Sequence, residues 1–337
     1  MPMTSRERML AAINYESPDK LPVVYHPSPA GLYVHGEKLL KLFQDNPGDN
    51  AVEFKSISQP PPETIDENGA YHEIKTDGWG TEWEFLIFGI QGHPRAYPFE
   101  SWKEAADYEF PDVWCSDAEE VKRYKQTYLF YEGGISIMEK LQALRPMDEV
   151  LMDIYTQDDY FMAFLDRLVD YMLEMVQAKL DAGVDMVFFG DDWGTQTAPI
   201  ISPDMFREIF LPRYVKLMDP IHSAGRGVFF HTCGQLGPLF KDLVNLGIRV
   251  IWPQIIPFES DPANLQACVD NKVGVFIHPD RQNLIPLGTP REIEKTIKRY
   301  AETFHNLGGG GIFYVEIEND APFENVKALI ESVQAYR

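Results

Sequence analysis

Short apolar runs alternate with longer amphipathic stretches from about residue 127 to the end of the chain. The apolar runs lack polar alternation, which is typical of strands buried on both faces of a parallel sheet. They predict strands at 128–131, 186–190, 228–231, 250–252, 273–278 and 312–315. The amphipathic stretches predict helices at 159–182, 205–224, 237–246 and 289–306. Thr4 and Glu7 have capping-box spacing, and Ser202 and Thr289 each precede a proline, so helices are predicted to begin there.

Polar residues stand at or just after the ends of these strand-like runs. They occur in the segments GDDWG (190–194), HTCG (231–234), PQ (253–254), HPDRQ (278–282) and EIEN (316–319). In a (β/α)8 barrel such strand ends converge on one mouth, where active sites are assembled. A doubly wound sheet also fits the alternation, but it would be expected to show a Gly-rich phosphate loop after its first strand. We therefore predict a (β/α)8 TIM barrel.

The first 126 residues have a less regular pattern. Residues 21–25 predict the first barrel strand. Residues 45–112 are rich in Pro, Gly and aromatic residues, with hairpin-like segments at 71–74 and 81–87. We predict a single domain over residues 1–337, in which 45–112 form an inserted elaboration over the mouth or rim of the barrel.

The composition restricts the class of protein. A net charge of −22 argues against a nucleic-acid partner, which would require clustered Lys and Arg. No apolar run approaches the roughly 18 residues that span a membrane. Three cysteines are too few for a disulfide framework. These features predict a cytoplasmic protein, and they leave its oligomeric state open.

The segment His231-Thr232-Cys233-Gly234 directly follows the apolar run 227–230. An imidazole and a thiolate that leave one strand end together are able to bind zinc. The alternative is a core histidine beside a buried thiol. We predict His231 and Cys233 as metal ligands.

Several segments together resemble the uroporphyrinogen decarboxylase superfamily. They are TSRERMLAAI (4–13), PDKLPV (18–23), DGWGTEW (77–83), DDWGTQ (191–196), ISPDMFR (201–207), HTCG (231–234), GTP (288–290) and PFENV (322–326). The resemblance covers nearly the whole chain and independently implies a TIM barrel. Segments 191–196, 201–207 and 231–234 are similar to the methyltransferase branch of the superfamily, which transfers methyl groups to or from the cobalt of a corrinoid on a partner protein.

True decarboxylases of this superfamily bind their polycarboxylate substrate with an N-terminal arginine motif. This chain has no Arg between Arg8 and Arg95, which argues against that reaction. Branch members that act on coenzyme M bind zinc through His-x-Cys and a distant C-terminal Cys, whereas no Cys follows Cys268 here. We predict Glu316 as the third zinc ligand, although it could instead pair with Arg281. The other carboxylates available are Glu318, Asp191 and Asp192.

Four residues are candidates for catalysis. Of Asp191 and Asp192, one is expected to act as acid, base or substrate anchor and the other to cap a turn, with Asp192 preferred in the site. His278 and Gln282 are placed to bond a substrate oxygen or a neighbouring loop.

A carboxylate in place of a thiolate gives a harder metal, which favours cleavage of a methyl–oxygen bond. We therefore predict a zinc-dependent methyltransferase that moves a methyl group from a small donor, such as an aromatic methyl ether, to the Co(I) of a corrinoid protein. The alternatives are a methylcorrinoid:thiol methyltransferase of the coenzyme M type, a decarboxylase-like lyase and a non-catalytic ligand-binding barrel.

Overall fold

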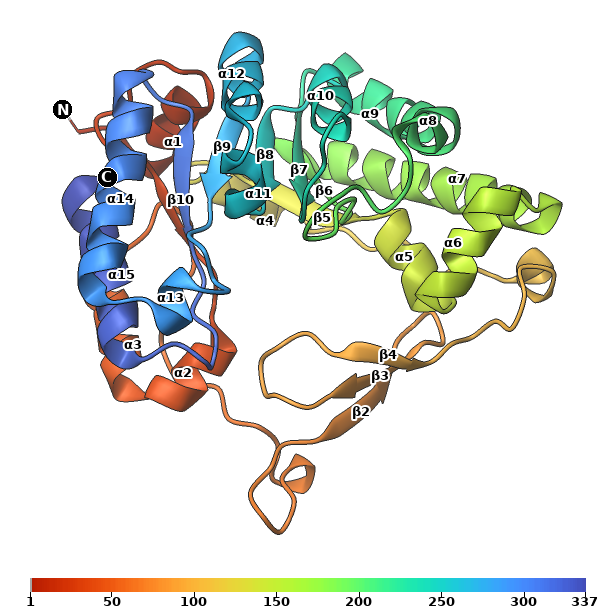
Figure 1. The fold of residues 1–337 in the computed structure, drawn as a ribbon, viewed down its shortest axis with the longest axis horizontal. Helices are drawn as coiled ribbons and strands as arrows, with labels where there is room; N and C mark the ends of the chain where they lie inside the picture. The colour runs from red at the N-terminus through yellow and green to blue at the C-terminus, as the bar shows by residue number, and fades with distance from the viewer. Residues whose placement is uncertain (1) are drawn as a thin grey trace.

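A computed structural model describes residues 2–337 of the chain. Within these residues, seven parallel strands form one curled sheet in the order β1-β10-β9-β8-β7-β6-β5 (Figure 1). The strands are β1 (Val23–Tyr25), β5 (Tyr131–Ile135), β6 (Met186–Gly190), β7 (Gly227–Thr232), β8 (Val250–Pro253), β9 (Gly274–Ile277) and β10 (Gly311–Val315). The first strand pairs with the last, as in a closed barrel. The predicted TIM-barrel fold is confirmed.

Helices cover the outside of the sheet, and shorter helices follow the strand ends (Figure 1). The α-helices that precede β6 in the chain are α1 (Ser5–Ile13), α2 (Pro29–His35), α3 (Glu37–Asp45), α4 (Ala118–Tyr124), α5 (Met138–Leu144), α6 (Met147–Thr156) and α7 (Asp159–Ala182). After β6 they are α8 (Pro203–Met205), α9 (Leu211–Ser223), α10 (Leu239–Asn245), α11 (Ile255–Glu259), α12 (Pro262–Asn271), α13 (Leu284–Leu287), α14 (Pro290–Asn306) and α15 (Phe323–Tyr336). Among residues 2–337, none of these helices has the length and apolar character needed to cross a membrane.

The strand predicted at 128–131 is wrong in position, because β5 begins at Tyr131 and runs to Ile135. Tyr128 still belongs to the turn after α4, where its N–H bonds the carbonyl of Tyr124. The register of β5 shifts between Glu132 and Ile135, where the chain carries two glycines that interrupt the apolar pattern.

The place of an eighth strand, between β1 and β5, has no regular ladder within the described residues. Asp49 and Asn50 bond the free edge of β1 there. The Asp49 N–H donates to the Val23 carbonyl (2.6 Å), and the Asn50 side chain bonds both the N–H and the carbonyl of Tyr25 (3.0 and 2.8 Å). The Asp49 carboxylate also accepts the Val23 N–H at 3.0 Å. The backbone and side chain of Asp49 and the side-chain amide of Asn50 thus replace the hydrogen bonds of a strand.

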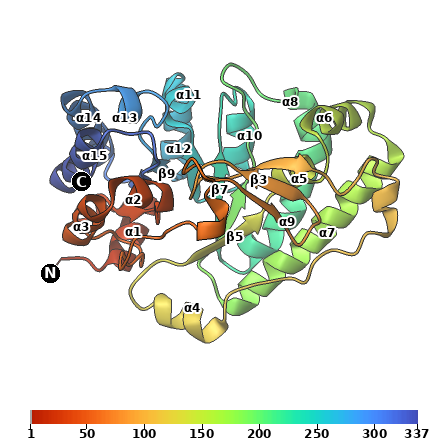
Figure 2. The ribbon, with the colours of Figure 1, turned by 90° about the horizontal axis from the view of Figure 1, so that it is seen from below.

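Residues 45–112 also contain a second sheet, with the antiparallel strands β2 (Glu73–Thr76), β3 (Glu82–Phe85) and β4 (His93–Ala96). The predicted hairpin is confirmed, and β4 was not predicted because its sequence HPRA lacks a strand pattern. Figures 1 and 2 place this sheet on the side toward which the barrel strands run. The assignment of 1–337 as one domain with a rim elaboration stays a prediction.

Candidate active site

Alternate residues of the barrel strands fill the lumen and then reach the mouth. Inside, Phe229, Phe276 and Tyr314 belong to one buried cluster. Residues that lie two positions further along each strand point to the same side and reach the mouth. They are His26, His231, Trp252, His278 and Glu316. The Trp252 ring is centred 4.2 Å from that of His231 and 5.9 Å from that of His278. The period of two along parallel strands therefore gathers these polar residues in one layer.

Asp192, His231 and Cys233 form a cluster at this mouth. One possible ligand atom of each lies within 4.8 Å of the other two. Nε2 of His231 is 3.5 Å from both Cys233 Sγ and Asp192 Oδ1. Asp192 Oδ1 accepts a hydrogen bond from the Cys233 N–H at 2.7 Å. The structure thus brings the two predicted His-x-Cys ligands together with the preferred aspartate.

A contact between two loops assembles the cluster. The Gly194 N–H donates to the Cys233 carbonyl (3.1 Å), and the Gln235 N–H donates to the Thr195 carbonyl (2.7 Å). Gly234 has φ of +81°, and a Cβ there would lie 2.2 Å from the backbone of Gly194. The two glycines let the loops after β6 and β7 touch, which sets Asp192 beside Cys233.

The donor atoms of this cluster suit zinc. Nδ1 of His231 lies 2.9 Å from the Trp252 carbonyl, so the proton belongs on Nδ1 and the Nε2 lone pair faces Cys233. Burial lowers the pKa of His231, and the Asp192 carboxylate acts in the opposite direction. Burial raises the pKa of the Cys233 thiol to about 12, so a neighbouring cation is required for it to ionise. An imidazole nitrogen, a thiolate and a carboxylate are all zinc ligands.

Glu316 lies in the same pocket but outside this cluster. Its Oε1 is 3.3 Å from Nδ1 of His26, and that nitrogen also accepts the Ser28 N–H at 3.0 Å. Burial raises the pKa of Glu316. Among the described residues, Glu318 rather than Glu316 pairs with Arg281, with Oε1 3.2 Å from Nη1. The side chain of Glu316 therefore faces the pocket without a firm ion pair.

Asp191 does not line the pocket. It is fully buried, and its carboxylate accepts hydrogen bonds from the N–H groups of Ile137 (2.8 Å) and Glu139 (3.0 Å) and from the Tyr214 hydroxyl (2.6 Å). Burial raises the pKa of Asp191 to about 7, against the effect of these three bonds. Its contacts fix the start of α5 beside the end of β6.

His278 and Gln282 both line the pocket. Burial lowers the pKa of His278 to about 3, and the Arg281 charge adds to this effect, so its imidazole is neutral at neutral pH. The Gln282 amide oxygen accepts from the Gln254 side chain (3.1 Å), whose own oxygen accepts the Gly234 N–H (3.0 Å). Gln282 is thereby linked to the loop that carries Cys233.

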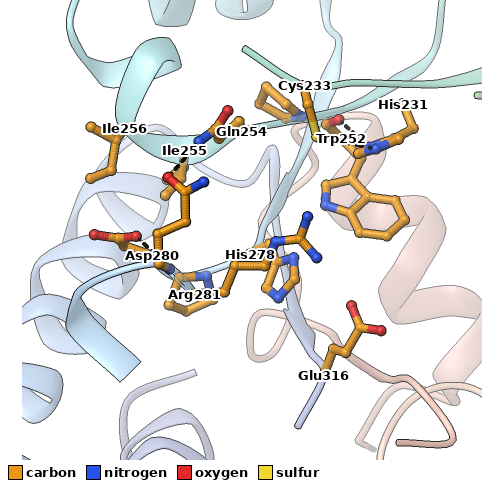
Figure 3. A pocket seen from close by; sticks show the side chains of 13 residues that line it. His231, Cys233, Trp252, Gln254, Ile255, Ile256, His278, Asp280, Arg281 and Glu316 are labelled. Atoms are coloured by element: carbon orange, nitrogen blue, oxygen red, sulfur yellow. Dashed lines mark hydrogen bonds between the residues drawn. The ribbon is translucent and has the colours of Figure 1, made fainter. Parts of the chain in front are cut away.

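These groups surround a pocket that opens to solvent at the barrel mouth (Figure 3). Figure 3 shows Trp252, Gln254 and Arg281 at this pocket together with His231 and Glu316. The strand-end positions of the segments 253–254 and 278–282 predicted that Gln254 and Arg281 lie at the mouth, but gave neither residue a role of its own. Trp252 was not singled out, and the period of two through 250–252 was the available signal for it.

The family model for uroporphyrinogen decarboxylase (URO-D) matches residues 130–336. The chain belongs to this family. Curated uroporphyrinogen decarboxylases from Coxiella burnetii are 24% identical over 190 residues, which cover 54% of this chain and 49% of theirs. The enzyme of that name from Pseudoalteromonas atlantica is 24% identical over 218 residues, 62% of this chain and 55% of its own. The chain thus spans about half the length of the curated relatives it matches.

A solved methyltransferase from Methanosarcina mazei is similar in fold. The TM-score is 0.65 at 18% sequence identity, and the match covers 99% of both chains. This likeness extends the TIM-barrel assignment over the whole URO-D-family chain, including the part before residue 130. The family match over residues 130–336 confirms the superfamily that the sequence motifs indicated.

Proposed function

We propose that this member of the URO-D family is a zinc-dependent methyltransferase that moves a methyl group from a small donor to the Co(I) of a corrinoid protein. The observation that carries the proposal is the cluster of Asp192, His231 and Cys233 at the barrel mouth. The fold of the Methanosarcina mazei methyltransferase supports it. Arg281 is the single arginine among the described residues that line the pocket, and one arginine suits a polycarboxylate porphyrinogen poorly.

Asp192, His231 and Cys233 are the proposed zinc ligands. They supply three protein donors, which leaves one position open for a substrate atom as in other catalytic zinc sites. Glu316, the third ligand predicted from the sequence, faces the same pocket and is the alternative to Asp192. A zinc ion bound there would act as a Lewis acid on the oxygen of the methyl donor.

The protein's own groups orient this site. The Trp252 carbonyl holds the His231 ring through Nδ1, and the Asp192 carboxylate holds the backbone of Cys233. Neutral His278 is proposed to donate a hydrogen bond to the leaving oxygen, and Gln282 to bond the donor from the rim. Asp191 is proposed to act indirectly, because its buried contacts keep β6 and α5 in place.

The corrinoid is proposed to arrive on a partner protein that approaches the mouth. The sheet β2–β3–β4 lies on that side of the barrel, so residues 45–112 are proposed to form the rim that the partner meets (Figure 2). The reaction would break the methyl–oxygen bond of the donor and form a methyl–cobalt bond with the electron pair of Co(I). The donor oxygen would keep the electron pair of the broken bond and leave as an alkoxide or phenoxide, which takes up a proton from solvent.

Metal analysis of protein purified without chelators tests the ligand set. We expect about one zinc per chain in the wild type, and loss of zinc in Cys233→Ala and Asp192→Ala. Glu316→Gln should keep the metal, and Cys115→Ala is the control for removal of a thiol outside the cluster. Loss of zinc in Glu316→Gln but not in Asp192→Ala would identify Glu316, and not Asp192, as the third zinc ligand. Absence of zinc from the wild type, even after it is added back, would contradict the proposal.

The reaction is tested with a reduced corrinoid protein and methyl donors. We expect methylcobalamin to form from an aromatic methyl ether, and its absorption spectrum measures this. Cys233→Ala should abolish it. A wild-type protein that holds zinc but transfers no methyl group from ethers, methanol or methylamines to Co(I) would contradict the assigned reaction.

A further inference from the structure

Arg281 is the only Lys or Arg among the described residues that line the mouth pocket. It follows β9 in the segment 278–282, and Figure 3 shows its side chain directed toward the region between Trp252 and Glu316. Its positive charge lies in the same pocket as Glu316 and beside Glu318, and the function proposed above gives it no role.

The loop that carries Arg281 is held in place by its own neighbour. The Asp280 carboxylate accepts the N–H groups of Gln282 (2.9 Å) and Asn283 (3.2 Å), and the Asp280 carbonyl accepts the Ile285 N–H (3.0 Å). Asp280 is therefore engaged within the turn and does not neutralise Arg281.

The guanidinium itself is only partly engaged. Among residues 2–337 its hydrogen-bond partner is Glu318, through one oxygen and one nitrogen 3.2 Å apart. An arginine has five N–H donors in a planar fork that fits a carboxylate through two parallel bonds. The Arg281 side chain is 51% exposed, and its pair with Glu318 rests on one contact. An acceptor that makes two contacts therefore replaces Glu318 readily.

We propose that Arg281 determines substrate specificity by binding a carboxylate of the methyl donor, which displaces Glu318 from the guanidinium. The proposal rests on the methyltransferase function proposed above. The donor class is an aromatic methyl ether that bears a carboxylate: its ring lies along Trp252 and its methyl group points toward Asp192, His231 and Cys233. A single arginine beside Glu316 and Glu318 suits one negative charge, and a phosphate dianion would remain partly uncompensated.

Equilibrium binding by calorimetry tests this on the purified protein with its measured zinc content. The probes are 4-methoxybenzoate, neutral 4-methoxybenzamide and cationic 4-methoxybenzylamine, which share the ring and the methyl ether. We expect the wild type to bind the benzoate about tenfold more tightly than the amide. Arg281→Gln should remove this preference and leave the affinity for the amide unchanged.

Three further variants sharpen the test. Arg281→Lys keeps the charge without the fork, and it should retain only part of the preference. Glu318→Gln removes the competing carboxylate, so it should tighten benzoate binding. Arg123→Gln, an exposed arginine on α4 outside the pocket, should bind as the wild type does.

Equal affinity of the wild type for the three probes, or a preference for the amine, would overturn the proposal. So would a benzoate preference that survives in Arg281→Gln. Tighter Arg281-dependent binding of 2-mercaptoethanesulfonate than of the benzoate would assign Arg281 to an anionic thiol acceptor instead, and would also overturn it. Because binding needs no corrinoid protein, a failure of methyl transfer with the preference intact counts against the reaction and not against Arg281.

Discussion

At the scale of single residues, the site depends on two glycines that let two loops meet. Gly234 has a positive φ, and a Cβ at this position would collide with the backbone of Gly194. Because the loops after β6 and β7 touch, the Asp192 carboxylate accepts a hydrogen bond from the Cys233 N–H. A metal ligand set drawn from two strands needs such a contact, because neither strand end alone supplies three donors.

Gly234→Ala should therefore separate Asp192 from Cys233. We expect it to lower the free energy of unfolding by more than about 3 kcal/mol, since it combines a strained φ with a backbone collision. Zinc content should fall with it. The control is Gly69→Ala, where φ is +82° but nothing lies within 4 Å of the added Cβ. That variant should lose only about 1 kcal/mol, as measured by urea unfolding. Equal losses in the two variants would contradict the role given to the loop contact.

At the scale of the elements, amphipathic helices with strong end signals hold the barrel from outside. In α14 the buried residues Ile293, Ile297, Tyr300 and Phe304 follow a helical period. The helix begins with a capping box, in which the Thr289 hydroxyl accepts the Glu292 N–H (3.3 Å) and the Glu292 carboxylate accepts the Thr289 N–H (2.8 Å). The box fixes where α14 starts after the loop that includes Arg281.

Removal of the cap by Thr289→Ala should lower the free energy of unfolding by about 1 kcal/mol. Thr303→Ala is the matched control, because Thr303 lies inside the same helix and its hydroxyl only bonds the Arg299 carbonyl four residues earlier. That control should lie within about 0.5 kcal/mol of the wild type. Chemical denaturation of both variants gives the comparison, and similar losses would argue against a specific role for the cap.

At the scale of the whole molecule, a buried charge network ties both ends of the chain to the open edge of the barrel. Asp49 contacts Arg8 of α1 and accepts a hydrogen bond from Arg337 at 2.7 Å. Its second role is to accept the Val23 N–H of β1 at 3.0 Å. The Asp49 side chain is 2% exposed and that of Arg337 is 5% exposed, so solvent does not replace these contacts.

Asp49→Asn removes the anion that the buried guanidinium groups of Arg8 and Arg337 share, and leaves Arg8 with Asp19 as its carboxylate partner. We expect a loss of about 3–5 kcal/mol in the free energy of unfolding. Asp45→Asn is the control, because Asp45 forms an exposed i,i+4 pair with Lys41, and it should cost less than about 0.5 kcal/mol. Thermal and urea unfolding measure both. A small loss for Asp49→Asn would show that the barrel edge is held by other contacts.

Local sequence pattern was sufficient to predict those features whose causes lie close together along the chain. The caps at Thr4 and Thr289, the helix Asp159–Ala182 and the buried strands other than β5 were predictable from local pattern and side-chain chemistry. The TIM barrel followed from repeated strand–helix units. The spacing of two between His231 and Cys233 indicated that their side chains lie together at one strand end, and their role as metal ligands stays a prediction. Family motifs added the superfamily, which the match over residues 130–336 confirms.

Long-range packing sets which carboxylate lies beside the His-x-Cys pair. Asp191 and Asp192 are neighbours in sequence, yet one turns into the core toward Tyr214 and the other meets Cys233. That choice depends on the contact of Gly194 with Gly234, forty residues away, which no local period encodes. The partner of Arg281 was likewise set by how the ends of β9 and β10 lie side by side. Local pattern fixes the elements, whereas the identity of neighbours across the mouth depends on how the whole barrel curls.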